Sequence, residues 1–158
     1  MKYLPIDKEL FVYNRKRFVE QLSSNSLAIF NSNDIVTTSA DSTMPFVQHR
    51  DIFHLSGVDQ EESILVLFPD GKDKNHREIL FLKETNEHIA IWEGAKLDKE
   101  SAQKNSGVEK IYWLNQMDEI LNVEIEKASK IYLNKNIHSR STSEVQTRDD
   151  RFRKVLIK

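Results

Sequence analysis

The sequence predicts a single mixed α/β domain in which helices cover a β-sheet. The chain has 158 residues, a length that is typical of one domain with its own core. It begins with a helical pattern and continues with a cluster of short apolar runs that are typical of strands. Helical and strand patterns then alternate, which indicates that helices pack on the sheet.

The N-terminal helix is predicted to begin after Asp7, whose carboxylate can cap its first turn. Its apolar side chains recur at helical spacing and share one face. They are Leu10, Phe11, Phe18, Val19 and Leu22. The polar run at 23–26 ends this helix.

Short apolar runs, each bounded by polar or turn residues, predict the first strands. In chain order these runs are 27–30, 52–55, 63–68, 77–83 and 88–92. The β-branched and apolar run at 63–68 is expected to be a central strand. Gly57 ends the run before it, and Pro69, Asp70 and Gly71 form a strong turn signal. Because the gaps are short, we expect antiparallel hairpins.

The second half of the chain combines helices and strands. A helix is predicted at 98–105, with Gly107 as its C-terminal stop, and a strand at 108–113. Asn115 is expected to cap a further helix, and 131–133 is the last predicted strand.

The C-terminal part of the sequence is polar. Residues 135–150 are predicted to form a linker, and apolar residues return at 155–157. We therefore expect residues 1–134 to form one domain, and residues 135–158 to comprise a linker and the start of a second, truncated domain.

Composition narrows the possible partners. The net charge is −2, from 23 basic and 25 acidic residues, so no nucleic-acid partner is expected. The longest apolar run, 64–68, is far shorter than the ~20 residues that span a membrane. The N-terminus lacks an apolar signal region, which predicts a cytoplasmic protein. The absence of cysteine excludes disulfides and thiolate sites.

The stretch around His49 and His54 contains several residues that can bind metals. These histidines are five positions apart, however, which separates them by ~140° on a helix and puts them on opposite faces of a strand. The helical zinc motif requires a spacing of four residues and an intervening Glu. No metal ligand is therefore predicted here.

No local motif predicts catalysis by this chain. His49, Arg50 and Asp51 spell a kinase tripeptide, but the Asn five residues later and the downstream Asp-Phe-Gly are absent. No G-x-S-x-G elbow occurs, and the four glycines cannot build a phosphate loop. Glu61 and Glu62 are expected to be solvated or capping groups rather than an acid–base pair.

Trp92 lies in the predicted strand at 88–92. Ile89 and Ile91 would occupy the core face of that strand, and Trp92 the more mixed face. The indole is then either an ordinary, partly buried packing residue or the wall of a binding site, because aromatic side chains are favoured at interfaces. The sequence pattern leaves both interpretations open.

Several short motifs, in this order and spacing, resemble the N-terminal domain of bacterial aminopeptidase P (Xaa-Pro aminopeptidase), in the creatinase and prolidase N-terminal domain family. The motifs are Ser39-Ala40-Asp41, Phe46-Val47-Gln48, Asp51-Ile52-Phe53-His54-Leu55-Ser56-Gly57, Asn75-His76 and Ile91-Trp92-Glu93-Gly94. The resemblance covers residues 8–134. His54 replaces the usual Tyr, and Ala95 stands where a basic residue is common.

The resemblance implies a three-layer α/β/α fold with a mixed sheet. It also implies that the hydrolytic site lies in a C-terminal catalytic domain, of which residues 135–158 would contain only the lead-in. That domain would supply two Asp, one His and two Glu around two divalent metals, usually manganese, whose bridging hydroxide attacks the bond before proline. No catalytic or metal-binding residue is expected in this chain.

The resemblance also assigns two substrate-binding residues. Trp92 would line the groove near the bound peptide. Asp41 would reach the active site of a neighbouring subunit, where a carboxylate can recognise the peptide's ammonium group. The implied partners are the chain's own C-terminal catalytic domain, a peptide with proline at its second position, and further copies in a homo-oligomer.

An alternative function remains open. Related domains occur in proteins that lost the peptidase activity, such as the large subunit of the FACT histone chaperone. This chain could therefore be a peptide- or protein-binding module of the same fold. Catalysis by this chain alone ranks below both interpretations.

Overall fold

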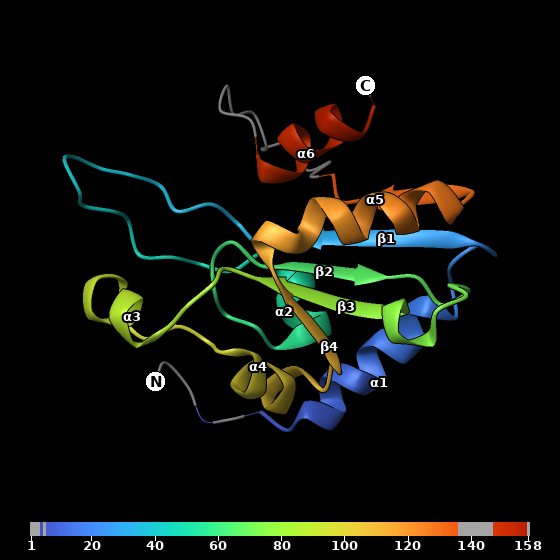
Figure 1. The fold of residues 1–158 in the computed structure, drawn as a ribbon, viewed down its shortest axis with the longest axis horizontal. Helices are drawn as coiled ribbons and strands as arrows, with labels where there is room; N and C mark the ends of the chain where they lie inside the picture. Colours follow the sequence, from blue (N-terminus) through green and yellow to red (C-terminus); the bar gives the residue numbers. More distant parts are fainter. Residues whose placement is uncertain (1–3, 5, 136–146, 158) are drawn as a thin grey trace.

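A five-stranded mixed sheet forms the centre of the computed structural model, which describes residues 4, 6–135 and 147–157 (Figure 1). The strand order is β4-β3-β2-β1-β5. The β1–β2 and β2–β3 pairs are antiparallel, whereas β1–β5 and β3–β4 are parallel. The strands are β1 (Ser26–Asn31), β2 (Ile64–Leu67), β3 (Glu78–Leu82), β4 (Lys110–Trp113) and β5 (Lys130–Leu133).

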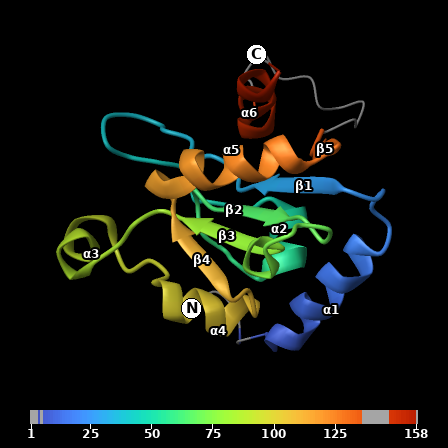
Figure 2. The same ribbon diagram turned by 45° about the vertical axis from the view of Figure 1, so that its right-hand side comes forward.

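Helices cover both faces of the sheet. Helices α1 (Lys8–Val19), α2 (Arg50–Ser56) and α4 (Lys99–Ser106) lie on one face, and α5 (Met117–Lys127) and α6 (Arg148–Leu156) on the other (Figures 1 and 2). The predicted three-layer α/β/α architecture with a mixed sheet is thereby confirmed. A short helix, α3 (Glu87–Glu93), and two 3₁₀ turns, η1 (Lys74–His76) and η2 (Leu114–Gln116), complete the described elements.

The alternation of side chains along each strand builds two cores. In β1, Ala28 and Phe30 face α1, α2 and α4, whereas Leu27 and Ile29 face α5. All four side chains are at most 7% exposed. Burial of each large apolar side chain contributes about 1.5–3 kcal/mol, so the two-sided sheet is the main source of stability.

The run at 52–55 was predicted as a strand, and this prediction is wrong because it belongs to α2. The His49 side chain caps this helix by accepting from the backbone N–H of Asp51. Ile52 and Leu55, three residues apart, are buried on the same helical face. Gly57 ends the helix with φ of 67°, as expected for a terminating glycine.

The run at 88–92 was also predicted as a strand, and it forms α3 instead. The side chain of Asn86 caps the helix by accepting from Ile89 N, and the N–H of Gly94 closes its last turn. Ile91 and Trp92 are 75% and 80% exposed, so the predicted core face of isoleucines is wrong as well. Local capping outweighed the β-branched composition here.

Two further expectations need correction. Asn115 does not cap α5, because η2 precedes that helix and the Asn115 amide donates to Glu84 instead. Of the predicted linker 135–150, residues 136–146 lie outside the described residues. Residues 148–150 were expected to be irregular but belong to α6, which Thr147 caps.

Helix α6 contacts the core through Phe152 and Leu156. The division of the chain into residues 1–134 and 135–158 stays a prediction. Within the described part of the chain, no helix is both long and apolar enough to cross a membrane.

Candidate functional site

Asp41 and Trp92 both lie on segments that project from the same end of the sheet (Figures 1 and 2). Asp41 is in the segment 33–47 between β1 and α2, here called the projecting loop, and its side chain is exposed. A bridge between Thr37 and Thr43 closes the tip around it. Trp92 is in the last turn of α3 and is 80% exposed.

The base of the projecting loop is fixed by a buried amide. Gln48 Nε2 donates to the carbonyl oxygens of Val58 and Gln60, at 3.0 and 2.9 Å, and Gln48 Oε1 accepts from the N–H of His49 at 2.8 Å. Asn33 Nδ2 donates to Val47 O across the loop at 2.9 Å. Because an unpaired buried amide is costly, these bonds define where the loop leaves the domain.

Helix α3 is connected to the sheet by charged side chains. Lys83 Nζ lies 2.8 Å from Glu93 Oε2 and 3.2 Å from Glu62 Oε2, and Lys96 pairs with Glu61. The hydrogen bond with Glu93 raises the pKa of Lys83, and the same bond lowers the pKa of Glu93. These contacts place α3 beside the start of β2 and the end of β3.

The projecting loop and α3 both expose large apolar side chains. They are Ile35, Val36, Met44, Val47, Ile91 and Trp92. Such side chains are favoured where a protein contacts another molecule. These exposed apolar side chains make this end of the sheet a candidate contact surface.

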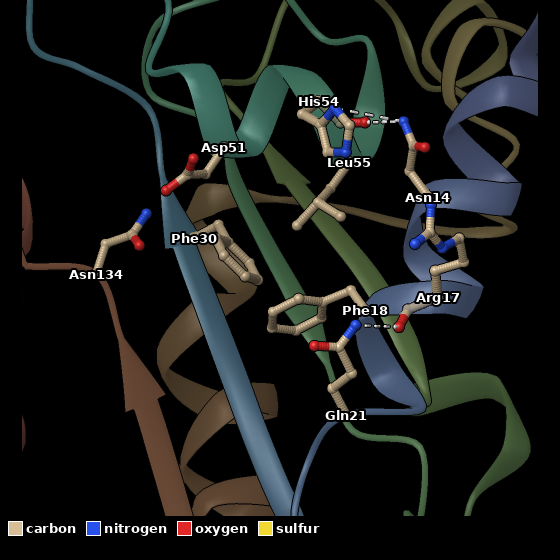
Figure 3. Close-up of a pocket in the computed structure, with 9 residues that line it drawn as sticks. All are labelled: Asn14, Arg17, Phe18, Gln21, Phe30, Asp51, His54, Leu55 and Asn134. Carbon is tan, nitrogen blue, oxygen red and sulfur yellow. Dashed lines mark hydrogen bonds between the residues drawn. The ribbon is translucent and has the colours of Figure 1, made fainter.

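A different region contains a cavity of about 400 Å³ between α1, α2 and β1 (Figure 3). Its apolar side is formed by Phe18 and Phe30, whose rings meet edge to face with centroids 5.2 Å apart. Asp51 and His54 lie at its rim. Its lining residues include none from the projecting loop or α3, so it is separate from Asp41 and Trp92.

The histidines of the Asp41–Gly57 stretch have structural contacts. His49 caps α2, and the Asn14 amide donates to the carbonyl of His54 at 2.9 Å. Among residues 4, 6–135 and 147–157, no group of three or more His, Asp or Glu side chains is placed to hold a metal ion. The described side chains alone therefore do not make up the two-metal centre that the resemblance implies for a catalytic domain.

A profile of the family described as "Aminopeptidase P, N-terminal domain" matches residues 11–132. The chain belongs to this family. The projecting loop, α3 and all five strands fall almost entirely within the matched range.

The aminopeptidase P N-terminal domain has named relatives of moderate identity. The chain is 29% identical over 116 residues to the Xaa-Pro aminopeptidase of Escherichia coli K12, covering 73% of this chain and 26% of that protein. It is 28% identical over 127 residues to mitochondrial intermediate cleaving peptidase 55 of Arabidopsis thaliana, covering 80% of this chain and 24% of that protein.

Solved structures share the fold. Pseudomonas aeruginosa aminopeptidase PepP superposes with a TM-score of 0.80 at 20% identity, covering 98% of this chain and 32% of that one. E. coli aminopeptidase P with the inhibitor Pro-Leu superposes with a TM-score of 0.74 at 26% identity, and the match covers 86% of this chain and 31% of that one. The chain thus spans about a quarter of the length of the curated relatives and about a third of the solved chains.

The structure of this aminopeptidase P N-terminal domain also contains a polar cluster that the sequence did not predict. His76 Nδ1 lies 2.8 Å from Glu124 Oε1, and His76 Nε2 lies 3.2 Å from the Tyr112 hydroxyl. Glu124 is 1% exposed and also accepts from Lys127 Nζ at 3.0 Å. These contacts connect η1, β4 and α5. The only signal of this cluster in the sequence was the Asn75-His76 motif.

Proposed function

We propose that this chain is the non-catalytic N-terminal domain of a metal-dependent Xaa-Pro aminopeptidase, an enzyme that removes the N-terminal residue before proline. Membership of the aminopeptidase P N-terminal domain family supports this proposal. The domain shapes access of the peptide to the catalytic domain and contributes to contacts between subunits. The main observation in favour is that exposed Asp41 and Trp92 project from the same end of the sheet.

Each of the two residues has a chemical role in this proposal. The indole of Trp92 offers a flat apolar wall against which a proline ring or a neighbouring side chain can pack. The carboxylate of Asp41 forms a charge-assisted hydrogen bond with the peptide's ammonium group, in the active site of a neighbouring subunit. The apolar side chains around both residues exclude water from these contacts.

The metals of the reaction belong to the catalytic domain in this proposal. Two divalent ions, for which manganese is the expected identity, would polarise the scissile carbonyl there. One of the related E. coli structures is a zinc-substituted form in complex with product. The present domain contributes binding and positioning only.

The test uses the full-length protein that contains this domain. Trp92→Ala should lower kcat/KM for Xaa-Pro peptides by about tenfold, because truncation of an interface aromatic costs more than about 1 kcal/mol. Tyr13→Ala, at an exposed aromatic residue on α1, is the control and should leave kcat/KM unchanged. Equal kinetics of Trp92→Ala and the unmodified protein would contradict the groove assignment.

A second measurement separates the peptidase from a pure binding module. The full-length protein loaded with manganese should hydrolyse Xaa-Pro peptides, whereas this 158-residue chain alone should not. Peptide binding without hydrolysis by the full-length protein would favour the binding module. Hydrolysis by the isolated chain, free of contaminating peptidase, would refute the non-catalytic role.

A further inference from the structure

Helix α3 carries Trp92 but has no buried residue of its own. It contains seven residues, and isolated helices this short are not stable in water. Asn86 and Gly94 cap its two ends, but these caps bond only to the helix itself and do not attach it to the sheet. The position of α3 relative to the sheet must therefore come from other contacts.

Glu93 provides those contacts from the end of the helix. Its Oε2 atom lies 2.8 Å from Lys83 Nζ, which follows β3, and 3.9 Å from Lys96 Nζ. Lys83 in turn lies 3.2 Å from Glu62, and Lys96 pairs with Glu61, both of which precede β2. Glu93, the residue next to Trp92, thus connects α3 to the end of the sheet through two lysines.

Gly94 lies between Glu93, at the end of α3, and Lys96. Gly94 has φ of 81° and ψ of 166°, a conformation that is essentially restricted to glycine. A Cβ atom at Gly94 would meet nothing within 4 Å, so there is free space around this backbone. Lys96 and Glu61 are only 11% and 13% exposed, and their ion pair anchors the chain just after Gly94.

We propose that Glu93 is a positioning residue, and that with Lys83 and Lys96 it forms an electrostatic latch that holds α3 and Trp92 against the end of the sheet. When the Lys83–Glu93 contact opens, α3 moves about Gly94 and the indole leaves its place. The consequence for substrate binding rests on the proposed function, whereas the latch itself does not.

The strength of the latch depends on salt. Lys83, Glu62 and Glu93 are 34%, 44% and 41% exposed, so their contacts are partly screened by solvent. At physiological ionic strength the screening length is about 8 Å, and at 1 M it is about 3 Å. The Lys83–Glu93 contact therefore weakens in concentrated salt, while the more buried Lys96–Glu61 pair weakens less.

The first test measures the order of α3 by NMR relaxation in this 158-residue chain. In low salt, the backbone order parameters of Ala90 to Glu93 should be near about 0.85, and in Glu93→Gln they should fall below about 0.6. Lys83→Gln should have the same effect. Lys83→Arg keeps the positive charge and should therefore keep the order parameters of the unmodified protein.

The matched control is Glu87→Gln on the same helix. Among the described residues, Glu87 makes no ion pair with Lys83 or Lys96, so its neutralisation should leave the order of α3 unchanged. Helical Cα chemical shifts for residues 87–93 show whether the released segment keeps its helix or unfolds, and either outcome supports the latch when the order parameters fall. Unchanged order parameters in Glu93→Gln would refute the latch.

The second test connects the latch to the peptide. In the full-length protein, Glu93→Gln should raise KM for Xaa-Pro peptides by about two- to fivefold with kcat unchanged, because the groove wall binds substrate and transition state equally. A loss of order in α3 without any change in KM supports the latch and contradicts the role of Trp92. A fall in kcat alone contradicts the positioning role.

Discussion

Arg15 of α1 donates from Nε to Glu78 of β3 at 2.9 Å, and its side chain is completely buried. Arg15 Nη1 also donates to the carbonyl oxygens of Leu55 and Ser106, at 2.8 and 2.9 Å, in the last turns of α2 and α4. The C-terminal ends of helices carry partial negative charge and favour a cation. One guanidinium thus joins three helices to the sheet.

Replacement of Arg15 by Met should strongly destabilise the domain. It leaves the carbonyls of Leu55 and Ser106 without a donor in a buried place, at an expected cost of about 3 kcal/mol in the free energy of unfolding. Urea denaturation measures this difference. The control is Arg17→Met, an exposed position on the same helix, which should change stability by less than about 0.5 kcal/mol. Equal effects at both positions would contradict the role of Arg15.

The glycine that ends α2 allows a second comparison. Gly57 has φ of 67°, and a Cβ atom there would clash with the ring of Phe11, whereas at Gly94 it would have open space. Gly57→Ala should therefore lower the free energy of unfolding by clearly more than Gly94→Ala. At Gly94 only backbone strain opposes the substitution, and it should cost about 1–3 kcal/mol. Thermal unfolding of both variants provides the comparison, and the reverse order would show that Phe11 can move aside at little cost.

The sequence predicted the parts of the fold that depend on burial. The strands with continuous apolar runs, such as 27–30 and 77–83, lie where they were expected, because a buried strand needs apolar residues on both faces. The N-terminal helix begins after its predicted cap, Asp7, but Leu10, which was expected on the apolar face, is exposed.

The failures share a physical cause. Residues 52–55 and 88–92 have strand-like composition, but the side chains of His49 and Asn86 cap the following N–H groups and start helices. Short elements of this kind depend on such local bonds, which periodicity does not reveal. For the site, Asp41 and Trp92 came from the motifs alone, and their roles in binding stay predictions.

The contact between Lys83 and Glu93 predicts how the order of α3 depends on pH. The hydrogen bond with Lys83 lowers the pKa of Glu93. The stabilisation that Glu93 gives to the attachment of α3 is therefore present above its unfolded pKa of 4.5, and it is lost as pH falls through the folded pKa. The same bond raises the pKa of Lys83. The stabilisation from Lys83 is therefore present below its unfolded pKa of 10.5, and it is lost as pH rises through the folded pKa.

The NMR order parameters of α3 should therefore be constant between pH 5 and 10, within the window set by the two unfolded pKa values of 4.5 and 10.5. They should decrease on the acid side. In Glu93→Gln the acid decrease should disappear, because the residue that titrates is gone. A decrease centred near neutral pH would instead indicate that another group controls the helix.

The contact between His76 and Glu124 supports a last prediction, about the attachment of α5 to the sheet. Glu124 Oε1 has close contacts with His76 and Lys127, and Glu124 Oε2 has no hydrogen-bond partner among the described residues. Glu124→Ala should cost about 1–3 kcal/mol in the free energy of unfolding, because it leaves His76 Nδ1 without its partner, while the contact of His76 Nε2 with the Tyr112 hydroxyl does not involve Glu124.

A double-mutant cycle tests whether His76 and Glu124 act together. The effects of His76→Ala and Glu124→Ala should not add, and their coupling energy should be about 1–3 kcal/mol, because each change removes the same partly buried contact. Glu126→Ala, at an exposed position on α5, should be additive with His76→Ala within about 0.5 kcal/mol. A coupling energy near zero for Glu124 would mean that α5 is held by its apolar contacts alone, through Leu121 and its neighbours.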